Sequence, residues 1–505
     1  MDGSIEETYP DRFAPLEIEA DEFRELGHEL VDQVADFLAT LPGRPVTTGE
    51  SPSLIRSLLG ESPLPQQGTD AKILLKETAN LLFDHSLFNG HPKYWGYISS
   101  SAAPIGILGD FLAATINPNV GAWNLSPVAS EIERQTIKWI AEMVGYPLDC
   151  GGLLVSGGNM ANFVGFLAGR HAKAGWDVRA SGQLAPEAKR LRVYASAETH
   201  TWINKAADMF GLGTDSIRWI QTDADLRMDT DLLKAQIEMD FKNGDKPFLV
   251  VGTAGSVSTG VTDPLGEISK ICREFGLWFH ADGAYGALAA CLPDVEPDLK
   301  ALTEADSIAL DPHKWLYAPL EAGCTLVRDS KILRDTFNYQ PSYYKFDEVG
   351  GEPTIVYNEY GPQNSRGFRA LKVWLGLKQV GRSGYERMIS DDIKLAEKLY
   401  QLADKHPELQ AFSHNLSITT FRYVPEALKQ GHEERETYLN QLNTEILTRL
   451  QEGGEAFVSN AMIAGKYVLR ACIVNFRTNL KDIEALPEIV IRIGRKVDAE
   501  LQANH

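Results

Sequence analysis

Between residues 150 and 330 the sequence repeats a strand–turn–helix rhythm that leaves few possible folds. Seven short runs are almost continuously apolar, which is typical of strands covered on both faces of a sheet. Amphipathic helices are expected between the earlier runs, for example over Met160–Ala172 and Pro264–Phe275. This alternation predicts an α/β fold with a mostly parallel sheet. The candidate strands are Leu153–Val155, Arg192–Ala195, Ile217–Gln221, Phe248–Thr253, Trp278–Ala281, Asp306–Leu310 and Cys324–Val327.

The sequence on either side of this region has a different pattern. Residues 1–90 predict helices, with apolar positions at helical spacing from Phe23 to Leu38 and from Ile73 to Phe88 around a turn-rich stretch from Pro45 to Gly68. These helices have little core of their own, so we expect them to pack on another domain or subunit. Beyond residue 380 shorter helices and strands alternate, with strands expected over Leu416–Phe421 and Tyr467–Val474. The expected domains are therefore 1–90 (helical, dimerising), 91–378 (large) and 379–505 (small α+β).

Composition excludes several classes of protein. The 505 residues carry a net charge of −20, and such a surface repels nucleic acid and anionic membranes. No apolar run approaches the ~18 residues of a spanning helix. The five cysteines are scattered, odd in number and without a CxxC pair, so we predict neither a metal site nor a disulfide framework. The acidic start of the chain lacks the features of a signal peptide, and we expect a cytoplasmic protein.

Polar residues stand where several of the candidate strands end. Asp282 follows one strand, Asp311-Pro312-His313-Lys314-Trp315 follows another, and Ser156 to Asn162 follows the first and opens a helix. Thr253 and His200 lie at or just beyond the ends of two more. Taken singly, such an aspartate is more often a helix cap, a lysine a surface charge and a glycine pair a tight turn. The GxGxxG and GxxxxGK[ST] phosphate signatures are both absent.

Taken together, these residues indicate a particular chemistry. Ligands of parallel sheets bind beyond the carboxyl ends of the strands, where these residues meet. A glycine-rich turn that opens a helix can bind a phosphate through backbone N–H groups. A carboxylate can hold a proton on a pyridine nitrogen, and a partly desolvated lysine favours Schiff-base chemistry. Pyridoxal 5′-phosphate (PLP) requires these three partners.

With these residues the chain resembles the PLP-dependent group II amino-acid decarboxylases, the family that includes aromatic-L-amino-acid decarboxylase and glutamate decarboxylase. The resemblance covers nearly the whole chain and implies fold type I, as in aspartate aminotransferase. It also implies a homodimer with active sites at the subunit interface. The motifs that carry it are the helical segment Gly27 to Leu38, His91-Pro92-Lys93-Tyr94, Trp123-Asn124-Leu125-Ser126-Pro127, Gly157-Gly158-Asn159, His280 to Tyr285 and His313-Lys314-Trp315.

The resemblance implies a role for each matching residue. Lys314 would bind PLP as a Schiff base and later move protons, and Asp282 would pair with the pyridine nitrogen. His200 would stack on one face of the ring and approach the substrate carboxylate, while Ala284 packs on the other face. Thr253 would hydrogen-bond near Asp282. The residues expected to hold the phosphate are Gly158, Asn159, Met160 and His313, and those expected to contact substrate are Ser100, Tyr97, Ile98 and Trp123.

The segment from Tyr343 to Arg366 bears on the type of reaction. It is rich in Gly, Glu and Asp and predicts a mobile loop. In the family a loop tyrosine protonates the carbanion at Cα, and the matching residue is Tyr357, with Tyr360 as an alternative. A phenylalanine at this position would instead indicate the oxidative, aldehyde-forming members.

The resemblance favours decarboxylation of an aromatic L-amino acid to the arylalkylamine and CO2. Tryptophan is slightly favoured over tyrosine, phenylalanine and dihydroxyphenylalanine, because Gly121 leaves room on a strip that lines the neighbouring subunit's pocket in the family dimer. The alternatives are an aldehyde synthase, an aminotransferase, a PLP-carrying protein without turnover, or a decarboxylase of glutamate, aspartate or cysteine sulfinate. An acidic substrate needs a cation, for which Arg470 and Arg477 are candidates. One departure from the family pattern is Asp311, where many relatives carry asparagine.

Overall fold

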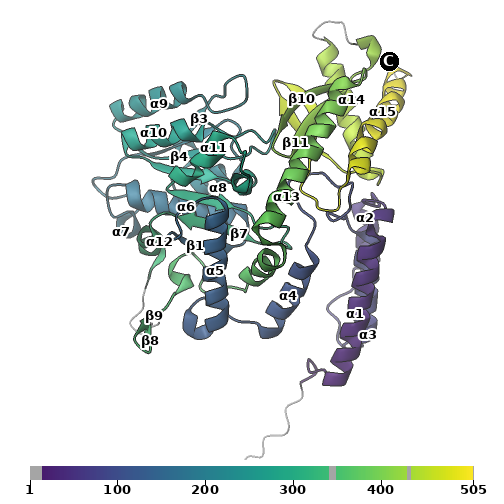
Figure 1. Ribbon diagram of the computed structural model, residues 1–505, viewed down its shortest axis with the longest axis horizontal. Coiled ribbons are helices and arrows are strands. Elements are labelled where there is room, and N and C mark those ends of the chain that lie inside the picture. Colours follow the sequence, from purple (N-terminus) through teal and green to yellow (C-terminus); the bar gives the residue numbers. More distant parts are fainter. Residues whose placement is uncertain (1–13, 340–347, 429–433, 504–505) are drawn as a thin grey trace, which may run out of the picture. The chain divides into compact units, whose positions relative to one another are not determined.

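The computed structural model describes residues 14–339, 348–428 and 434–503. Its first compact unit runs to Phe88 and includes Glu452–Gly454, and its second unit holds the rest of the described chain (Figure 1). In the first unit α1 (Ala20–Thr40) packs on α3 (Ala71–His85). Between them lies α2 (Pro52–Leu59), in a stretch that the sequence predicted as turns, so that prediction was wrong. Ser51 caps α2 by accepting a hydrogen bond from the Leu54 N–H, and the helix is too short to show a clear apolar period.

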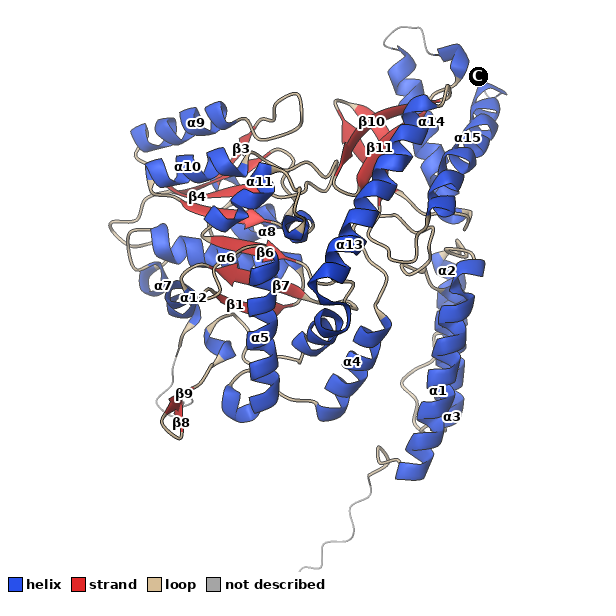
Figure 2. Ribbon diagram, viewed as in Figure 1, coloured by secondary structure: helices blue, strands red, loops and turns tan. Residues whose placement is uncertain are grey.

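A seven-stranded sheet dominates the second unit, in the order β1-β7-β6-β5-β4-β2-β3 (Figure 2). β7 runs in the opposite direction to the other six strands, so the sheet is mostly parallel, as predicted. All seven expected strands are confirmed, with ends that differ by at most two residues. Their bounds are β1 Gly151–Val155, β2 Leu191–Ser196, β3 Ile217–Ile220, β4 Lys246–Thr253, β5 Trp278–Asp282, β6 Ser307–Leu310 and β7 Gly323–Val327.

Helices pack along this sheet. α6 lies against β4, β5, β6 and β7, while α9 and α10 lie against β3, β4 and β5. Because β1, β2, β4, β5 and β6 share one direction, their carboxyl ends meet at one edge. The helices of this region are α4 Pro104–Ile116, α5 Pro127–Met143, α6 Gly158–Lys173, α7 Val178–Ser181, α8 Trp202–Met209, α9 Thr230–Lys242, α10 Leu265–Phe275, α11 Pro297–Lys300 and α12 Ser330–Phe337.

A second, antiparallel sheet lies in the C-terminal part, with its own apolar core. Its strand order is β10-β11-β13-β12, and the sequence predicted only the two central strands. α13 (Ala370–Lys405) crosses the expected boundary at residue 378 and is kinked at Gly381, which has φ 70° and ψ 167°. The domain boundaries stay predictions. The remaining elements are β8 Glu348–Val349, β9 Glu352–Pro353, β10 Leu409–Asn415, β11 Ile418–Tyr423, β12 Ser459–Ile463, β13 Lys466–Cys472, α14 Glu434–Glu452 and α15 Leu480–Ala503.

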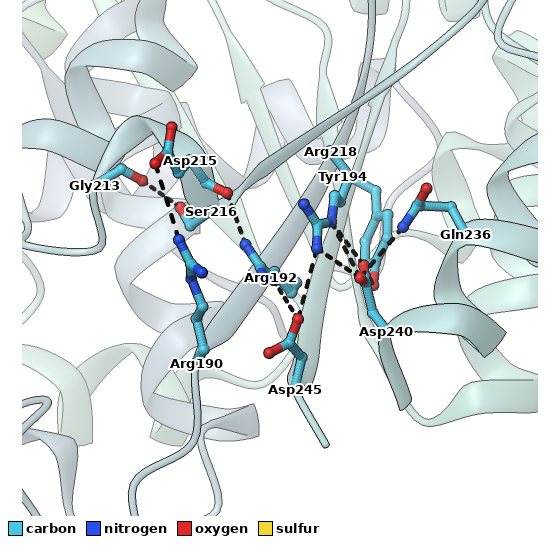
Figure 3. A network of polar contacts seen from close by, with 10 residues as sticks. All are labelled: Arg190, Arg192, Tyr194, Gly213, Asp215, Ser216, Arg218, Gln236, Asp240 and Asp245. Carbon is cyan, nitrogen blue, oxygen red and sulfur yellow. Dashed lines mark hydrogen bonds and ion pairs between the residues drawn. The ribbon is translucent and has the colours of Figure 1, made fainter. Parts of the chain in front are cut away.

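One polar cluster ties the far edge of the large sheet to α9 (Figure 3). Asp240 on α9 is fully buried and accepts hydrogen bonds from Arg218 Nη2 over 2.7 Å and Tyr194 Oη over 2.9 Å. Burial alone would raise the pKa of Asp240, but the bonds from Arg218 and Tyr194 outweigh burial and the pKa is lowered. Asp240 is therefore ionised and paired, and it joins β2 and β3 to the helix. We name this group the Asp240 network.

The length and polarity of the helices bear on insertion into a membrane. Every helix in residues 14–339, 348–428 and 434–503 is too short or too polar to cross a membrane.

Candidate active site

A cavity of about 180 Å³ lies at the edge of the large sheet where the strand ends meet. Its walls come from the ends of β4 and β5, from the turns after β2 and β6 and from the first turn of α6. Nine residues that the sequence analysis assigned to a site line it together, although they are spread over more than two hundred residues of chain. The lining consists of Ile98, Gly158, Asn159, Asn162, His200, Thr253, Gly255, Val257, Asp282, Ala284, Tyr285, Asp311, His313 and Lys314.

Lys314 lies in a charged group on the turn after β6. Its Nζ is 3.0 Å from Asp311 Oδ2, and His313 Nε2 is 3.7 Å from the same oxygen. Asp311 Oδ1 is buried and has no hydrogen-bond partner. Burial lowers the pKa of His313, although the charge of Asp311 opposes this, and its Nδ1–H donates to the Ala322 carbonyl over 2.7 Å. The turn therefore presents the primary amine of Lys314 and a carboxylate oxygen, Asp311 Oδ1, that can still accept a hydrogen bond.

Asp282 is held in place by a residue that the sequence analysis missed. Trp202 is fully buried on α8, and its Nε1–H donates to Asp282 Oδ2 over 2.7 Å. The Ala284 N–H donates to the other oxygen over 3.2 Å. Both oxygens of Asp282 are therefore oriented, which is the support that a fixed carboxylate needs. A buried tryptophan directly after His200-Thr201 was the available signal, but its partner lies 80 residues away.

His200 follows β2 and reaches the cavity as a neutral ring. Its Nδ1 accepts from the Trp202 backbone N–H over 3.3 Å, so the ring proton is assigned to Nε2. Burial lowers the pKa of His200, and the charge of Asp282 only partly opposes this. The ring can stack on a planar ligand and donate one hydrogen bond.

The first turn of α6 offers an anion site. Gly157 precedes the helix with φ 98°, a left-handed conformation that favours glycine, and no side chain caps the helix. The leading N–H groups of α6 therefore have no partner from a capping side chain. A Cβ added at Gly158 would lie 2.7 Å from Asp311 Oδ2, so glycine is required there too. Uncapped N–H groups suit a phosphate.

Thr253 closes the cavity beside Asp282, at the end of β4. Its backbone N–H donates to Asp263 Oδ2 over 2.9 Å, and its Oγ1 is 3.5 Å from Thr199 Oγ1. Burial raises the pKa of Asp263 to about 6. Asp263 therefore fixes the strand end from outside the cavity.

Five expected residues lie outside the cavity lining. Ser100 is nearest, since its Oγ donates to the His313 carbonyl over 2.6 Å. Met160 packs against the core of the large sheet, and Tyr97 is exposed. Trp123 donates its Nε1–H to Glu131 over 3.2 Å. The structure does not bring these four side chains, or Tyr357, to Lys314.

Tyr357 occupies a buried turn. The Arg366 guanidinium lies 4.8 Å from its ring centroid, and its Oη is buried without a partner. Burial raises the pKa of Tyr357 well above its ordinary value. Residues 343–347 of the expected mobile loop lie outside the described residues. Residues 348–366 form the β8–β9 hairpin and this turn. The β8–β9 hairpin of this segment is exposed, whereas Tyr357 and Glu359 in the turn are buried.

A larger cavity of about 980 Å³ lies elsewhere in the second unit, between the turn before α9, the loop 259–262 and the small sheet. It contains neither Lys314 nor any other residue expected at the site. The size of a cavity therefore does not identify the active site here. The smaller cavity is the candidate because it holds a lysine, an oriented carboxylate, a neutral imidazole and a helix start.

These groups fit PLP. The amine of Lys314 matches the aldehyde, Asp282 the ring nitrogen, and the uncapped start of α6 the phosphate. Ala284 and His200 both line this cavity, and the methyl group of Ala284 takes up little of its space.

Comparison with known proteins gives the family independently. Residues 52–424 match the family model of the pyridoxal-dependent decarboxylase conserved domain. An aromatic-L-amino-acid decarboxylase of Bacillus atrophaeus is 34% identical over 93% of this chain and 94% of its own length. A histidine decarboxylase of Drosophila melanogaster is 32% identical over 92% of this chain and 54% of its own length.

The fold agrees with a solved structure of the same kind. Oryza sativa TDC, solved with PLP and tryptamine, superimposes with a TM-score of 0.87 and 26% identity, over 96% of this chain and 99% of that one. The matching family model, the identities along the whole chain and the groups that meet around Lys314 agree. The chain belongs to the pyridoxal-dependent decarboxylase family and is a PLP-dependent carboxy-lyase.

Proposed function

We propose that the chain decarboxylates an aromatic L-amino acid to its arylalkylamine, with Lys314 as the residue that binds PLP. The observation that carries this proposal is the convergence of Lys314, Asp282 and His200 on one cavity at the strand ends. PLP held there supplies an electron sink for the electron pair that is left at Cα when CO2 departs.

Each side chain would have one task around the bound cofactor. Asp282, oriented by Trp202, keeps a proton at the pyridine nitrogen, which makes the ring a better acceptor of electrons. His200 and Ala284 confine the ring from its two faces, and the Nε2–H of His200 is available to a substrate carboxylate. His313 and the N–H groups of Gly158, Asn159 and Met160 hold the phosphate. Ser100 supports the turn through the His313 carbonyl.

An aromatic substrate is favoured by the relatives and by a group of aromatic residues formed by Tyr94, Tyr97 and Phe457. The Bacillus atrophaeus relative is named for aromatic amino acids and matches along the whole chain. Tyr94 stacks on Phe457 with ring centroids 5.2 Å apart, and the Tyr97 ring lies 6.2 Å from Phe457. These rings extend from the exposed Tyr97 to the buried Tyr94.

A decarboxylase of an acidic amino acid is the second candidate, and Arg470 is the observation that favours it. Arg470 is buried, and its Nε donates to Ser459 Oγ over 3.0 Å. Its Nη1 donates to the carbonyl of Val257, which lines the cavity. Both acceptors are neutral. The positive charge of Arg470 therefore lies directly behind the cavity wall, and these two contacts provide no carboxylate to neutralise it. Arg477, the other candidate, instead lies over the Phe476 ring at 4.4 Å.

We further propose a homodimer. α4 exposes a row of large apolar residues, and packing them against a second subunit would remove them from water. The same holds for α1 and α3 of the first unit, which fits their expected role in dimerisation. These exposed residues are Leu108, Phe111, Leu112 and Ile116 on α4, and Phe23, Val31, Ile73, Leu74 and Leu82 on α1 and α3. The expected location in the cytoplasm stays a prediction.

Tyr357 stays our candidate for the group that protonates Cα. Its turn is bound to the strip around Gly121, since the Asn358 N–H donates to the Gly121 carbonyl over 2.8 Å and the Trp123 N–H to Ile355 over 3.1 Å. The family resemblance places that strip at the pocket of the neighbouring subunit. Tyr357 would then serve the partner's cavity.

The test is release of CO2 and amine by the PLP-loaded protein across all L-amino acids. Amine from tryptophan, tyrosine, phenylalanine or dihydroxyphenylalanine supports the proposal and ranks the substrates. Amine from glutamate or aspartate alone would select the second candidate, and hydrogen peroxide with aldehyde would indicate an aldehyde synthase. Tyr357→Phe should divert product from amine towards aldehyde, and an unchanged amine yield would remove Tyr357 from the mechanism.

A further inference from the structure

We propose that Asp392 is a positioning residue that fixes the stretch from Lys314 to Tyr317 and thereby the amine that binds the cofactor. This inference rests on the proposed role of Lys314. Asp392 lies on α13, outside the cavity lining, and the chemistry described above does not use it.

Asp392 holds two residues of the lysine turn with one oxygen. Its Oδ2 accepts from Trp315 Nε1 over 3.0 Å and from Tyr317 Oη over 2.6 Å. All three side chains are buried. Because both donors follow Lys314 within three residues, the carboxylate fixes the turn from the side away from the cavity. A carboxyl group that accepts two hydrogen bonds holds such a turn more firmly than apolar packing would.

The backbone of the turn needs such support. Tyr317 has φ 52°, in the left-handed region that an aromatic residue rarely adopts. A conformation of this kind persists only where surrounding contacts over-determine it. Here the Ala103 N–H donates to the Tyr317 carbonyl over 2.8 Å, and Asp392 anchors the phenol.

The same contacts reach the cavity wall. The Trp315 ring lies 4.7 Å from the ring of Tyr285, which lines the cavity directly after Ala284. Tyr285 is fixed in turn by a 2.7 Å hydrogen bond to Ser417 Oγ. Asp392 therefore supports both Lys314 and the part of the cavity wall that Tyr285 forms.

The electrostatic surroundings agree with a positioning role. In the described chain no lysine, arginine or histidine pairs with Asp392, and the titratable groups facing it are Tyr317, Tyr285, Cys472 and Asp391. Burial raises the pKa of Asp392 to about 7, while the bonds from Tyr317 and Trp315 act in the opposite direction. A buried carboxyl without a cation is costly, so its hydrogen bonds are the feature that explains its presence.

The test compares two substitutions that differ in one property. Asp392→Leu removes both acceptor oxygens, whereas Asp392→Asn keeps an amide oxygen that can still accept from Trp315 and Tyr317. Asp391→Asn is the matched control, because Asp391 is exposed on the next position of the same helix. The readouts are the visible absorbance of the lysine–cofactor adduct, its titration with pH, the fraction of Lys314 trapped by borohydride and measured by peptide mass, and kcat and KM.

We expect Asp392→Leu to shift the pH titration of the adduct, to lower the trapped fraction and to lower kcat by about tenfold to a hundredfold. Asp392→Asn should recover kcat to within about threefold, with Asp391→Asn unchanged. If Asp392→Leu fails to fold, Tyr317→Phe removes one of the two bonds at almost constant volume and should shift the same titration by a smaller amount.

A folded Asp392→Leu or Tyr317→Phe protein with the wild-type adduct band and titration would overturn the inference. So would equal loss of kcat in Asp392→Leu and Asp392→Asn with an unchanged adduct. Lys314→Ala separates this outcome from failure of the proposed function, since an adduct that survives Lys314→Ala would refute the role of Lys314 itself.

Discussion

The cavity around Lys314 and the Asp240 network both place buried carboxylates beside cations on the same sheet, and they differ in how fully those charges are satisfied. Asp240 uses both oxygens, with bonds from Arg218, Tyr194 and Gln236. Asp311 has Lys314 on one oxygen and nothing on the other. No buried side-chain nitrogen or oxygen of the residues drawn in Figure 3 lacks a partner. The complete network stabilises the fold, and the incomplete one can bind a ligand.

The largest expected effect is on the cavity alone. Lys314→Ala should abolish the absorbance of the bound cofactor and lower turnover by at least about a thousandfold, because the amine that holds the cofactor is lost. Lys205→Ala, an exposed lysine on α8, is the control. Turnover that survives in Lys314→Ala would remove the cavity from the mechanism.

The reverse effect is expected at the Asp240 network. Asp240→Ala leaves the Arg218 guanidinium without its main partner and should lower the free energy of unfolding by about 3–5 kcal/mol. The kcat per folded molecule should stay unchanged. Denaturant unfolding and active-site titration measure the two quantities, with the exposed Glu238→Ala as control. A large fall in kcat of the folded protein would show that the two clusters are coupled.

Trp202→Phe tests the support of the cavity from outside. The substitution removes the donor to Asp282 while keeping an aromatic ring in the core. We expect a loss of about tenfold in kcat, equivalent to one hydrogen bond to a charged group, and weaker binding of PLP. Trp219→Phe, on the exposed side of β3, should behave as wild type. An unchanged kcat in Trp202→Phe would mean that Asp282 needs no such orientation.

Asp311→Asn addresses the unsatisfied oxygen itself. Removing this charge takes a negative group away from the expected phosphate site, and PLP and inorganic phosphate should bind about fivefold more tightly. Titration of the cofactor-free protein measures both affinities, and the exposed Asp294→Asn is the control. Weaker binding of both anions would place the phosphate elsewhere.

The same contrast explains how far the sequence could be interpreted. Strand ends are local features, and eight of the nine expected residues that line the cavity lie at or just beyond them, whereas Ile98 was expected from the family resemblance alone. The supports are not local. Trp202 and Asp282 are 80 residues apart, and Trp315 and Asp392 are 77 apart, so no periodicity relates them. Single buried tryptophans and aspartates have many possible partners, and only the fold selects one.

Segments with weak patterns were also missed. α2 has only eight residues among prolines, serines and glycines, and the edge strands β10 and β12 alternate too irregularly to be distinguished from loops. Tyr357 shows a different limit. Its position was assigned by counting along a motif, which gives no information on burial, and the structure places it in a packed turn. Which tyrosine protonates Cα stays a prediction.

The dependence of stability on pH distinguishes Asp392 from both clusters. The pKa of Asp392 is raised to about 7 by burial, whereas in the unfolded chain an aspartate ionises near its ordinary pKa of about 3.9. Ionisation therefore costs the folded state more than the unfolded state. Its contribution to stability is fully present below about pH 4 and is lost as pH rises through 7.

Asp392→Asn removes this dependence. The difference in free energy of unfolding between Asp392→Asn and wild type should therefore rise by on the order of 2 kcal/mol between pH 5 and 8, in favour of the variant. Asp391→Asn should follow wild type, and parallel curves for Asp392→Asn and wild type would show that Asp392 is already ionised at pH 5.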